Sequence, residues 1–255
     1  LERNTRRQSL TDAGRVYYEE AKRVLEQVAI AESSVERLRL APAGTLRISA
    51  PTSFGACVIA PLTASFLQAW PDVRIELDLT NRMIDLVDEG FDLAIRLGVP
   101  RDSRLIAHKL EDASVGIFAA PDYLARRGTP RTLSDLEAHD CIQFILPSSG
   151  RPMPWIVIDE HGAPQDLVLR SSRRVLDEAL GCISWARAGG GLVQTYHFIA
   201  DESVARGELV EVLQLYGGGS RQFSILYPQN RHLSARVRAF VDYLRAASGG
   251  RNDLQ

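Results

Sequence analysis

Small and apolar residues recur every three or four positions near the start of the chain, in the order Tyr17, Ala21, Val24, Val28, Ala31, Val35 and Leu38. Charged residues fill most positions between them, so a narrow apolar seam runs along a polar segment. This spacing predicts a helix over residues 11–41, with Thr11 as its N-cap and Pro42 and Gly44 ending it. The seam packs either on its own domain or on another helix, and its length and narrowness favour a partner helix.

From residue 44 onward, short apolar runs typical of strands alternate with segments of helical spacing. Strands are expected at 46–49, 73–77, 92–96, 115–118, 141–144, 155–158, 167–169, 192–194, 208–213 and 223–227. Helices are expected at 56–67, 84–87, from 122 onward, at 175–188 and at 234–245. Repeated strand–helix–strand units with short connections predict parallel sheets covered by helices, which is the α/β class.

Composition and charge limit the classes of function. Of the 255 residues, 45% are hydrophobic and 24% are charged, which suits one large domain or two modest lobes. The net charge of −2 argues against a nucleic-acid-binding surface over most of the chain, apart from a basic cluster of Arg3, Arg6 and Arg7. We expect no segment long and apolar enough to span a membrane. The first ten residues lack the apolar core of a signal peptide, so we expect a cytoplasmic protein.

Residues that carry covalent or metal chemistry are scattered along the chain. Cys57, Cys141 and Cys182 are odd in number and form no CxxC pair, so we expect buried, reduced thiols and no disulfide. The five histidines show no ligand spacing, and the sequence contains no nucleophile elbow, phosphate loop or dinucleotide-binding motif. We therefore predict no metal, no cofactor and no catalytic residue, and we expect that the protein is not an enzyme.

Eight segments of the chain resemble, in the same order, segments of LysR-type transcriptional regulators. They are RNTRRQSLTDAG (3–14), GTLRISAPTSFG (44–55), FLQAWPDVRIELDLTNRMIDLVDEGFDLAIRLG (66–98), AAPDYLARRGTP (119–130), DLEAHDCIQF (135–144), GGGLVQTYHF (189–198), RGELVEVL (206–213) and LSARVRAFVDYL (233–244). Each segment alone is a weak signal. Together they are spread along the chain from residue 3 to residue 244, and their common order makes the resemblance specific.

The resemblance implies a periplasmic-binding-protein-like type II fold, in which two α/β lobes are joined by two crossovers and preceded by a long linker helix. An effector would bind in the cleft between the lobes, at the carboxyl ends of the strands, where open parallel sheets generally bind ligands. The implied divisions are a remnant of the wing of a winged helix-turn-helix (1–10), a linker and dimerisation helix (11–41), lobe I (44–114 and 219–248) and lobe II (115–218).

The resemblance also implies partners. The intact protein would bind DNA, a small-molecule effector and further copies of itself, as a homodimer or homotetramer. Arg3, Arg6 and Arg7 would contact DNA phosphates, which position a protein without reading sequence. The family's recognition helix would precede Leu1, so residues 1–255 alone are not expected to read an operator. A solute-binding protein of the same fold stays as the alternative, with an enzyme on this scaffold as a more remote one.

Polar residues that follow the first three expected strands are candidates for the lobe I side of an effector site. Thr52 and Ser53 begin a helix, where free N–H groups suit an anion; simple capping is the alternative, but the resemblance places effector contacts here and favours the anion. Thr80 and Arg82 follow the second strand and offer a hydroxyl and a cation, or else form a solvated turn. Arg96 ends the third strand and is either an anion clamp or part of a structural ion pair with an acid such as Asp85. We favour the structural role, and we expect Gly98 and Val99 to line the cleft.

Lobe II is expected to contribute Phe144, Thr195 and Tyr196, which lie at the ends of strands. Apolar walls with a few polar groups are typical of small-ligand pockets, although Phe144 would serve equally well in a core. Ser171 and Ser172 either form a second anion-binding helix start, before the helix expected at 175–188, or merely cap it. Together these residues predict a site for a small organic anion.

Overall fold

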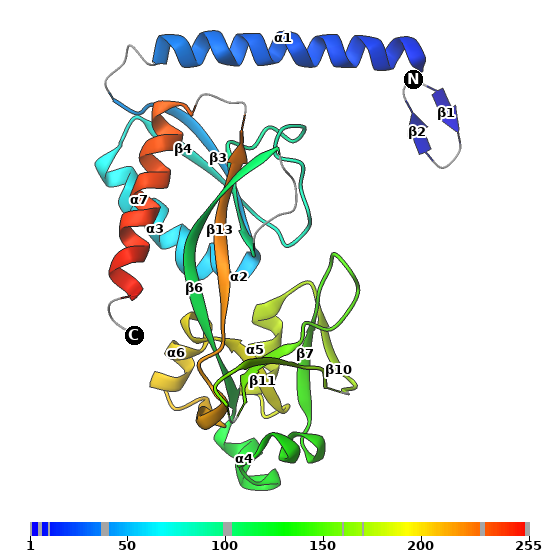
Figure 1. Cartoon of the computed structure of the whole chain (residues 1–255), viewed down its shortest axis with the longest axis vertical. Coiled ribbons are helices and arrows are strands. Elements are labelled where there is room, and N and C mark those ends of the chain that lie inside the picture. Colours follow the sequence, from blue (N-terminus) through cyan, green and yellow to red (C-terminus); the bar gives the residue numbers. More distant parts are fainter. Residues whose placement is uncertain are drawn as a thin grey trace.

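The structure is a computed structural model that describes residues 2–4, 7–9, 11–36, 41–98, 104–159, 161–169, 171–229 and 233–252. Two lobes lie one below the other, and the long helix α1 crosses the top of the upper lobe (Figure 1). The N-terminal hairpin lies at one end of α1, whereas the C-terminal helix α7 packs along the side of the upper lobe.

The hairpin and α1 precede both lobes. Strands β1 (Glu2–Asn4) and β2 (Arg7–Ser9) pair antiparallel, and α1 (Asp12–Glu36) follows them. Thr11 caps the helix as predicted, because the Gly14 N–H donates to Thr11 Oγ1 at 3.1 Å. Residues 37–40, which include Leu38 and the expected end of the helix, lie outside the described residues.

Lobe I is built on three parallel strands, β3 (Gly44–Ala50), β4 (Val73–Leu79) and β5 (Leu93–Leu97), in the order β5-β3-β4. The connection from β3 to β4 is helical throughout and comprises α2 (Thr52–Phe54), the π-helical turn η1 (Gly55–Ile59) and α3 (Ala60–Ala69). The closing helix is α7 (Ala235–Asn252). Fully buried side chains such as Ile48, Phe54, Phe66 and Phe240 join these elements in one core.

Lobe II repeats this plan with β7 (Cys141–Ile145), β10 (Arg173–Leu176) and β11 (Leu192–Tyr196), which are parallel in the order β10-β7-β11. Its helices are α4 (Pro121–Arg127), η2 (Leu133–Ala138), α5 (Ala179–Arg187), α6 (His197–Ala205) and η3 (Gln214–Tyr216), and its remaining strands are β8 (Trp155–Ile158), β9 (Pro164–Leu167) and β12 (Val210–Val212). Separate core clusters around Tyr123 and around Phe118 pack in this lobe.

Two long antiparallel strands, β6 (Leu105–Ala119) and β13 (Ser220–Pro228), run from one lobe into the other (Figure 1). In lobe I, β13 lies between β5 and β6, and in lobe II, β6 pairs with β11 and β12. Ser114 and Ser220 are register partners where the chain passes between lobes. The predicted α/β architecture with two crossovers is therefore confirmed, and the residue limits of the lobes stay a prediction.

The stretch Thr52–Ala69 is long and apolar enough to cross a membrane by length and composition alone. The expectation that no segment would reach that length is therefore wrong, because η1 joins two short helices into one run of 18 residues. In the structure 39% of this run is buried, and Phe54, Ile59 and Phe66 belong to the core of lobe I. A helix that covers a sheet meets the same criterion.

Two expected helices are wrong in place or kind. Residues 84–87 lead into turns, because the Asp85 carboxylate accepts the N–H groups of Val87 and Asp88, at 3.0 and 3.1 Å, and so competes with helical bonding. The helix expected from Val175 begins only at Ala179, because residues 173–176 form the four-residue strand β10, which pairs with β7. The strand expected at 167–169 lies earlier, at Pro164–Leu167.

Candidate effector site

The carboxyl ends of the parallel strands in both lobes meet at the junction between the lobes. Thr52 and Asn81 follow β3 and β4 in lobe I, and residues 177–178 follow β10 in lobe II. Hydrogen bonds between these two pairs, described below, join the lobes directly. Thr52, one of the predicted effector residues of lobe I, therefore contacts lobe II directly.

Thr52 forms hydrogen bonds to residues of both lobes. Its N–H donates to Asn81 Oδ1 at 3.1 Å, and its hydroxyl accepts from Asn81 Nδ2 at 2.9 Å. The same hydroxyl donates to Glu178 Oε1 of lobe II at 3.4 Å. Sequence reasoning named neither Asn81 nor Glu178 as a site residue, because the helix start in lobe II was expected upstream of Glu178.

Ser53 and Thr80 lie beside this contact. Ser53 is buried, with 6% of its surface exposed, and its hydroxyl has no hydrogen-bond partner among the described residues. Thr80 extends the sheet, because its N–H donates to the Ala50 carbonyl at 2.8 Å, and its hydroxyl accepts a long bond from the Arg82 N–H at 3.4 Å. Both hydroxyls keep capacity to bind a further group.

Arg82 is held by a carboxylate of its own loop. Its guanidinium donates to both carboxylate oxygens of Glu89, through Nη1 at 2.8 Å and through Nη2. This hydrogen bond raises the pKa of Arg82 and lowers the pKa of Glu89. A side chain in a bidentate pair is not free to clamp an anion, so the structure gives Arg82 a bracing role instead.

Arg96, at the end of β5, is a largely buried arginine. Its Nη2 donates to Ser49 Oγ at 2.8 Å and its Nη1 to the Ile95 carbonyl at 2.7 Å. Burial lowers its pKa to about 10, which leaves it protonated at neutral pH. The expected ion pair with Asp85 is wrong, since Asp85 pairs with Arg104 at 3.6 Å, and Arg96 makes no ion pair within the described part of the chain.

Tyr196 lies in an aromatic cluster that joins the lobes. Its ring stacks on Phe198 with centroids 5.0 Å apart, and Phe54 of lobe I stacks on Phe223 of β13 at 4.0 Å. Tyr196 and Phe223 lie 5.4 Å apart, so the four rings are continuous. Burial raises the pKa of Tyr196 to about 12, which keeps its hydroxyl protonated as a donor.

The remaining predicted residues lie in different surroundings. Gly98 follows β5 with a φ of +75° and with open space where a side chain would be. Thr195 is buried on β11, with 7% exposed, and Phe144 packs against the lobe II core around Phe118. Ser171 starts no helix: its hydroxyl donates to the Cys141 carbonyl and accepts the Arg173 N–H at 2.9 Å.

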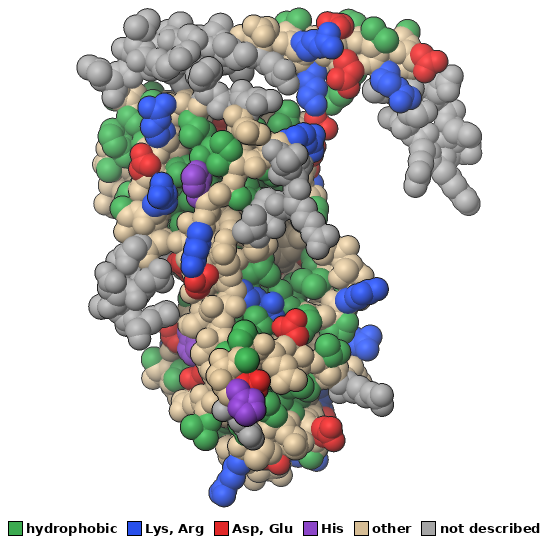
Figure 2. Space-filling view, viewed as in Figure 1, with side chains coloured by type: hydrophobic (Ala, Val, Ile, Leu, Met, Phe, Trp, Pro, Cys, Tyr) green, Lys and Arg blue, Asp and Glu red, His purple; other side chains and the backbone are tan. Residues whose placement is uncertain are grey.

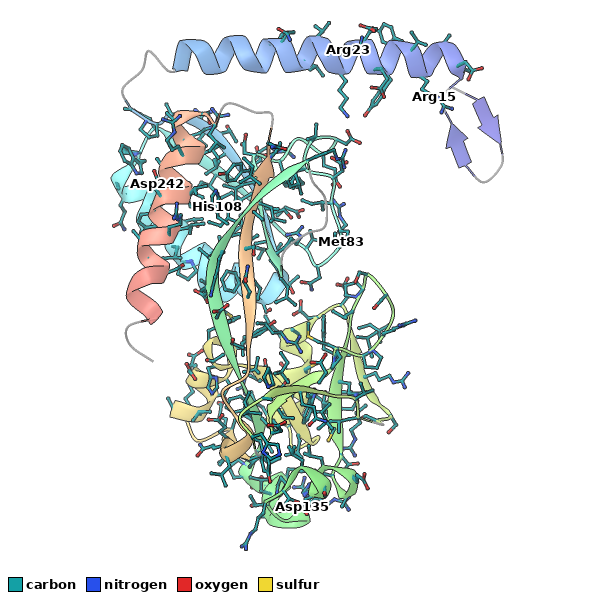
Figure 3. The ribbon with its side chains drawn as sticks, in the orientation of Figure 1. Arg15, Arg23, Met83, His108, Asp135 and Asp242 are labelled. Atoms are coloured by element: carbon teal, nitrogen blue, oxygen red, sulfur yellow. The ribbon has the colours of Figure 1, made fainter. Side chains whose placement is uncertain are left out.

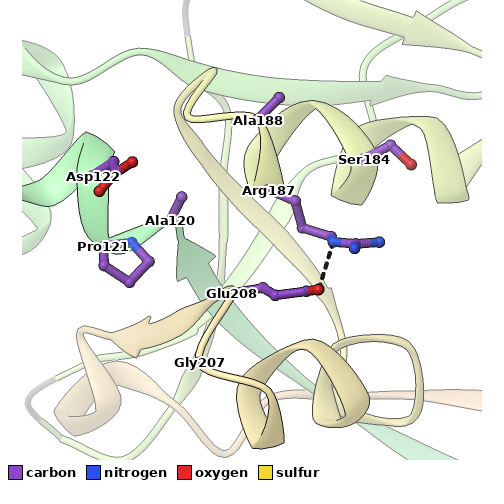
Figure 4. A pocket seen from close by; sticks show the side chains of 8 residues that line it. All are labelled: Ala120, Pro121, Asp122, Ser184, Arg187, Ala188, Gly207 and Glu208. Carbon is purple, nitrogen blue, oxygen red and sulfur yellow. Dashed lines mark ion pairs between the residues drawn. The ribbon is translucent and has the colours of Figure 1, made fainter.

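Two pockets have linings that do not include Thr52, Asn81, Asp177 or Glu178. One of about 590 Å³ lies in lobe II and contains the Arg187–Glu208 ion pair, 2.7 Å long (Figure 4). Another of about 530 Å³ lies in lobe I, between Arg47, Arg82 and Glu89. Figure 3 shows Met83, which is 72% exposed, on the side of lobe I that faces lobe II.

The three thiols differ in exposure. Burial raises the pKa of Cys141 and of Cys182 to about 12, as expected for inert core cysteines. Cys57 is exposed, so the prediction of three buried thiols is wrong for this one. Its pKa is raised by partial burial and by the nearby charges of Glu202 and Glu178. No group of three metal-ligating side chains occurs among the described residues.

Helix α1 carries much of its predicted seam on its surface. Tyr17, Val24 and Val28 are 77%, 62% and 48% exposed, whereas Ala21 is half-buried. Figure 2 shows hydrophobic, acidic and basic side chains interspersed along α1, and Figure 3 marks Arg15 and Arg23 on it. For four other predicted residues the structure describes the backbone: Ala31 and Val35 lie on α1, and Arg3 and Arg7 lie on the hairpin. Arg6, Leu38 and Val99 lie outside the described residues.

Known proteins resemble this chain over most of its length. The family model of the LysR substrate binding domain matches residues 40–249. The HTH-type transcriptional regulator CrgA of Neisseria meningitidis serogroup B is 32% identical over 248 residues, which cover 96% of this chain and 80% of CrgA. The HTH-type transcriptional regulator PtxR of Pseudomonas aeruginosa is 34% identical over 250 residues, which cover 98% of this chain and 78% of PtxR.

Solved structures show the same fold. The regulatory domain of CrgA matches with a TM-score of 0.72 and 29% identity, over 82% of this chain and 100% of that domain. The full-length structure of AphB, the Vibrio cholerae virulence activator, matches with a TM-score of 0.74 and 26% identity, over 96% of this chain and 82% of AphB.

The chain belongs to the LysR family of transcriptional regulators, and its two lobes are the effector-binding domain of that family. The periplasmic-binding-protein-like type II fold predicted from the sequence is confirmed. The alternative of a solute-binding protein is not favoured, because the relatives are regulators of transcription.

Proposed function

We propose that the junction between the lobes binds a small organic anion, and that this effector adjusts the DNA binding of an oligomeric regulator. The observation that carries the proposal is Arg96, a largely buried cation without an ion pair among the described residues. A buried charge is normally paired, so an anion beside Arg96 would offset the cost of its burial. Ser49, which already binds Arg96, lies on β3 just before Thr52 and Ser53.

The contributing groups come from both lobes. Thr52, Ser53, Thr80 and Gly98 offer hydroxyls and open backbone at the carboxyl edge of lobe I, while Thr195 and Tyr196 approach from lobe II. Phe144 supplies an apolar wall, and Arg82 acts through its brace on the loop. A ligand that touches both lobes would bias their relative angle, which is a natural two-state element for a switch.

The parts before the lobes are proposed to assemble the regulator and to hold DNA. The predicted seam from Tyr17 to Leu38, in which Tyr17, Val24 and Val28 are exposed, would pair with the same helix of a second subunit, in a homodimer or homotetramer. Arg3, Arg6 and Arg7 would contact DNA phosphates in the intact protein, giving affinity that falls with salt. Such a regulator would work in the cytoplasm and without catalysis.

A thermal-shift screen of small carboxylates identifies the effector, since a ligand of the folded state raises the melting temperature. Calorimetry on Ser53→Ala, Thr80→Val and Arg96→Gln then tests the site, with Thr129→Val on the exposed surface of lobe II as the control. Loss of one charge-assisted hydrogen bond weakens binding about ten- to hundredfold. Affinities within about twofold of the parent in all three variants place the site elsewhere, and binding by neutral ligands alone rejects the anion.

A further inference from the structure

Four residues form a direct contact that joins the lobes, and we name Thr52, Asn81, Asp177 and Glu178 the latch. Asn81 Nδ2 donates to the Asp177 carbonyl of lobe II at 2.6 Å and to Thr52 Oγ1 at 2.9 Å. Thr52 Oγ1 then donates to Glu178 Oε1 at 3.4 Å. One amide side chain thus connects the start of α2 with the start of α5.

The lobe II half of the latch has an unusual backbone. Asp177 has a φ of +63°, and Leu213 is the other non-glycine residue with a positive φ in the described chain. This left-handed conformation is disfavoured for side chains with a Cβ, so neighbouring contacts must hold it. The bond from Asn81 to the Asp177 carbonyl is such a contact, which indicates that the latch and the turn stabilise each other.

Glu178 places a carboxylate where an anionic effector would bind. Its Oε1 accepts the Leu180 N–H at 2.9 Å, as the N-cap of α5, and accepts from the Thr52 hydroxyl. The bond from Thr52 is longer than the usual range for hydroxyl donors, about 2.5–3.0 Å, and is therefore weak. A carboxylate with better geometry at Thr52 would displace Glu178 from it.

We propose that the latch closes the junction between the lobes in the effector-free protein, and that an effector carboxylate opens it by replacing Glu178 at Thr52. That the latch closes the junction is argued from its hydrogen bonds alone. That an effector carboxylate replaces Glu178 rests on the proposed anion site. Glu178 is then an internal competitor that sets the effector concentration at which the regulator responds.

Hydrogen exchange across the lobes tests the closing role. In Asn81→Asp, the new carboxylate still accepts the Thr52 N–H, but it cannot donate to the Asp177 carbonyl or to Thr52 Oγ1, so both bonds of the amide nitrogen in the latch are lost. We expect exchange at residues 179–183 of lobe II to rise several-fold, although the change is in lobe I. Gln68→Glu, an exposed amide-to-acid change on α3, is the matched control. If hydrogen exchange changes only in lobe I, the latch does not hold the two lobes together and the proposal is overturned.

Thr52→Val provides a second variant if Asn81→Asp does not fold, because it removes the hydroxyl that links Asn81 to Glu178. Benzoate serves as the probe for the replacement. Glu178→Gln keeps an oxygen for the Leu180 N–H and loses the charge, so we expect benzoate to bind about tenfold more tightly. Equal affinity for the parent and the variant overturns the replacement. If benzoate binds to neither protein, the result counts against the proposed anion site. The closing role of the latch is then still tested by the hydrogen-exchange experiment.

Discussion

Helices α1 and α7 have similar periodic apolar positions, yet only α7 is buried by its own domain. On α7, Val237, Phe240, Val241 and Leu244 are at most 5% exposed, because they pack on the sheet of lobe I. On α1, Val16, Tyr17, Val24 and Leu25 are each more than 60% exposed. The same spacing thus marks a core on α7, where a sheet lies alongside, and an exposed apolar stripe on the part of α1 whose side chains the structure describes.

The largest expected effect is at the buried helix. Phe240→Ala removes a fully buried ring that contacts Phe66 with centroids 5.0 Å apart, so we expect the free energy of unfolding to fall by about 3–5 kcal/mol. Urea unfolding followed by circular dichroism measures it. Val24→Ala on α1 is the counterpart, and a change above about 0.5 kcal/mol in the unfolding of the lobes would contradict the contrast.

Deleting residues 1–40 separates α1 from the lobes. We expect light scattering to show fewer subunits per particle, so that the particle mass falls by more than the mass of the deleted residues. The lobes should keep their fold, because none of the α1 side chains that the structure describes belongs to their cores. Maleimide labelling checks this, since Cys57 should react while the buried Cys141 and Cys182 stay protected. An unchanged association state would show that α1 is not the dimerisation element.

A charge in the seam gives a smaller, more specific effect. Val24→Glu places a carboxylate in the predicted helix pair, and we expect the dissociation constant of the dimer to rise on the order of tenfold or more. Gln27→Glu adds the same charge to α1 at an exposed position outside the seam and should leave association nearly unchanged. Sedimentation equilibrium compares the two, and equal effects would show that the seam does not bind a partner.

The smallest effect is expected at the contact that ties α1 to lobe I. Lys22 Nζ donates to the Asp88 carboxylate, which raises the pKa of Lys22, but both side chains are partly exposed. The pair should contribute at most about 1 kcal/mol. Because the folded pKa is raised, this contribution is present below pH 10.5 and is lost as pH rises through the raised value. A double-mutant cycle with Lys22→Met and Asp88→Asn measures it at pH 7.

Local signals in the sequence were sufficient for much of the fold. The Thr11 cap, the strand at 46–49 and the closing helix after Ser234 were predicted because each depends on residues within one or two turns. The segment 84–87 was not, because the Asp85 side chain binds backbone N–H groups that a helix would need. Propensity alone does not decide which bond forms.

The candidate site depends on distant partners, and there the sequence was less informative. Arg82 had the right chemistry for an anion, but Glu89, seven residues away, already binds it. Asn81 and Glu178 are 97 positions apart in sequence and reach the same Thr52 hydroxyl only because two lobes fold against each other. No periodicity encodes such a contact, so it required the structure.

The two crossovers also determine the order in which the domain can form during synthesis. Strand β13 lies between β5 and β6 in lobe I, and Phe223, Ile225 and Phe240 complete its core. All three residues are synthesised after lobe II, whose core uses residues 117–213. Until they are made, the sheet and core of lobe I lack part of their residues. Contacts of such long sequence separation are slow to form. We therefore expect β13 and α7 to be the last elements of the two lobes to pack.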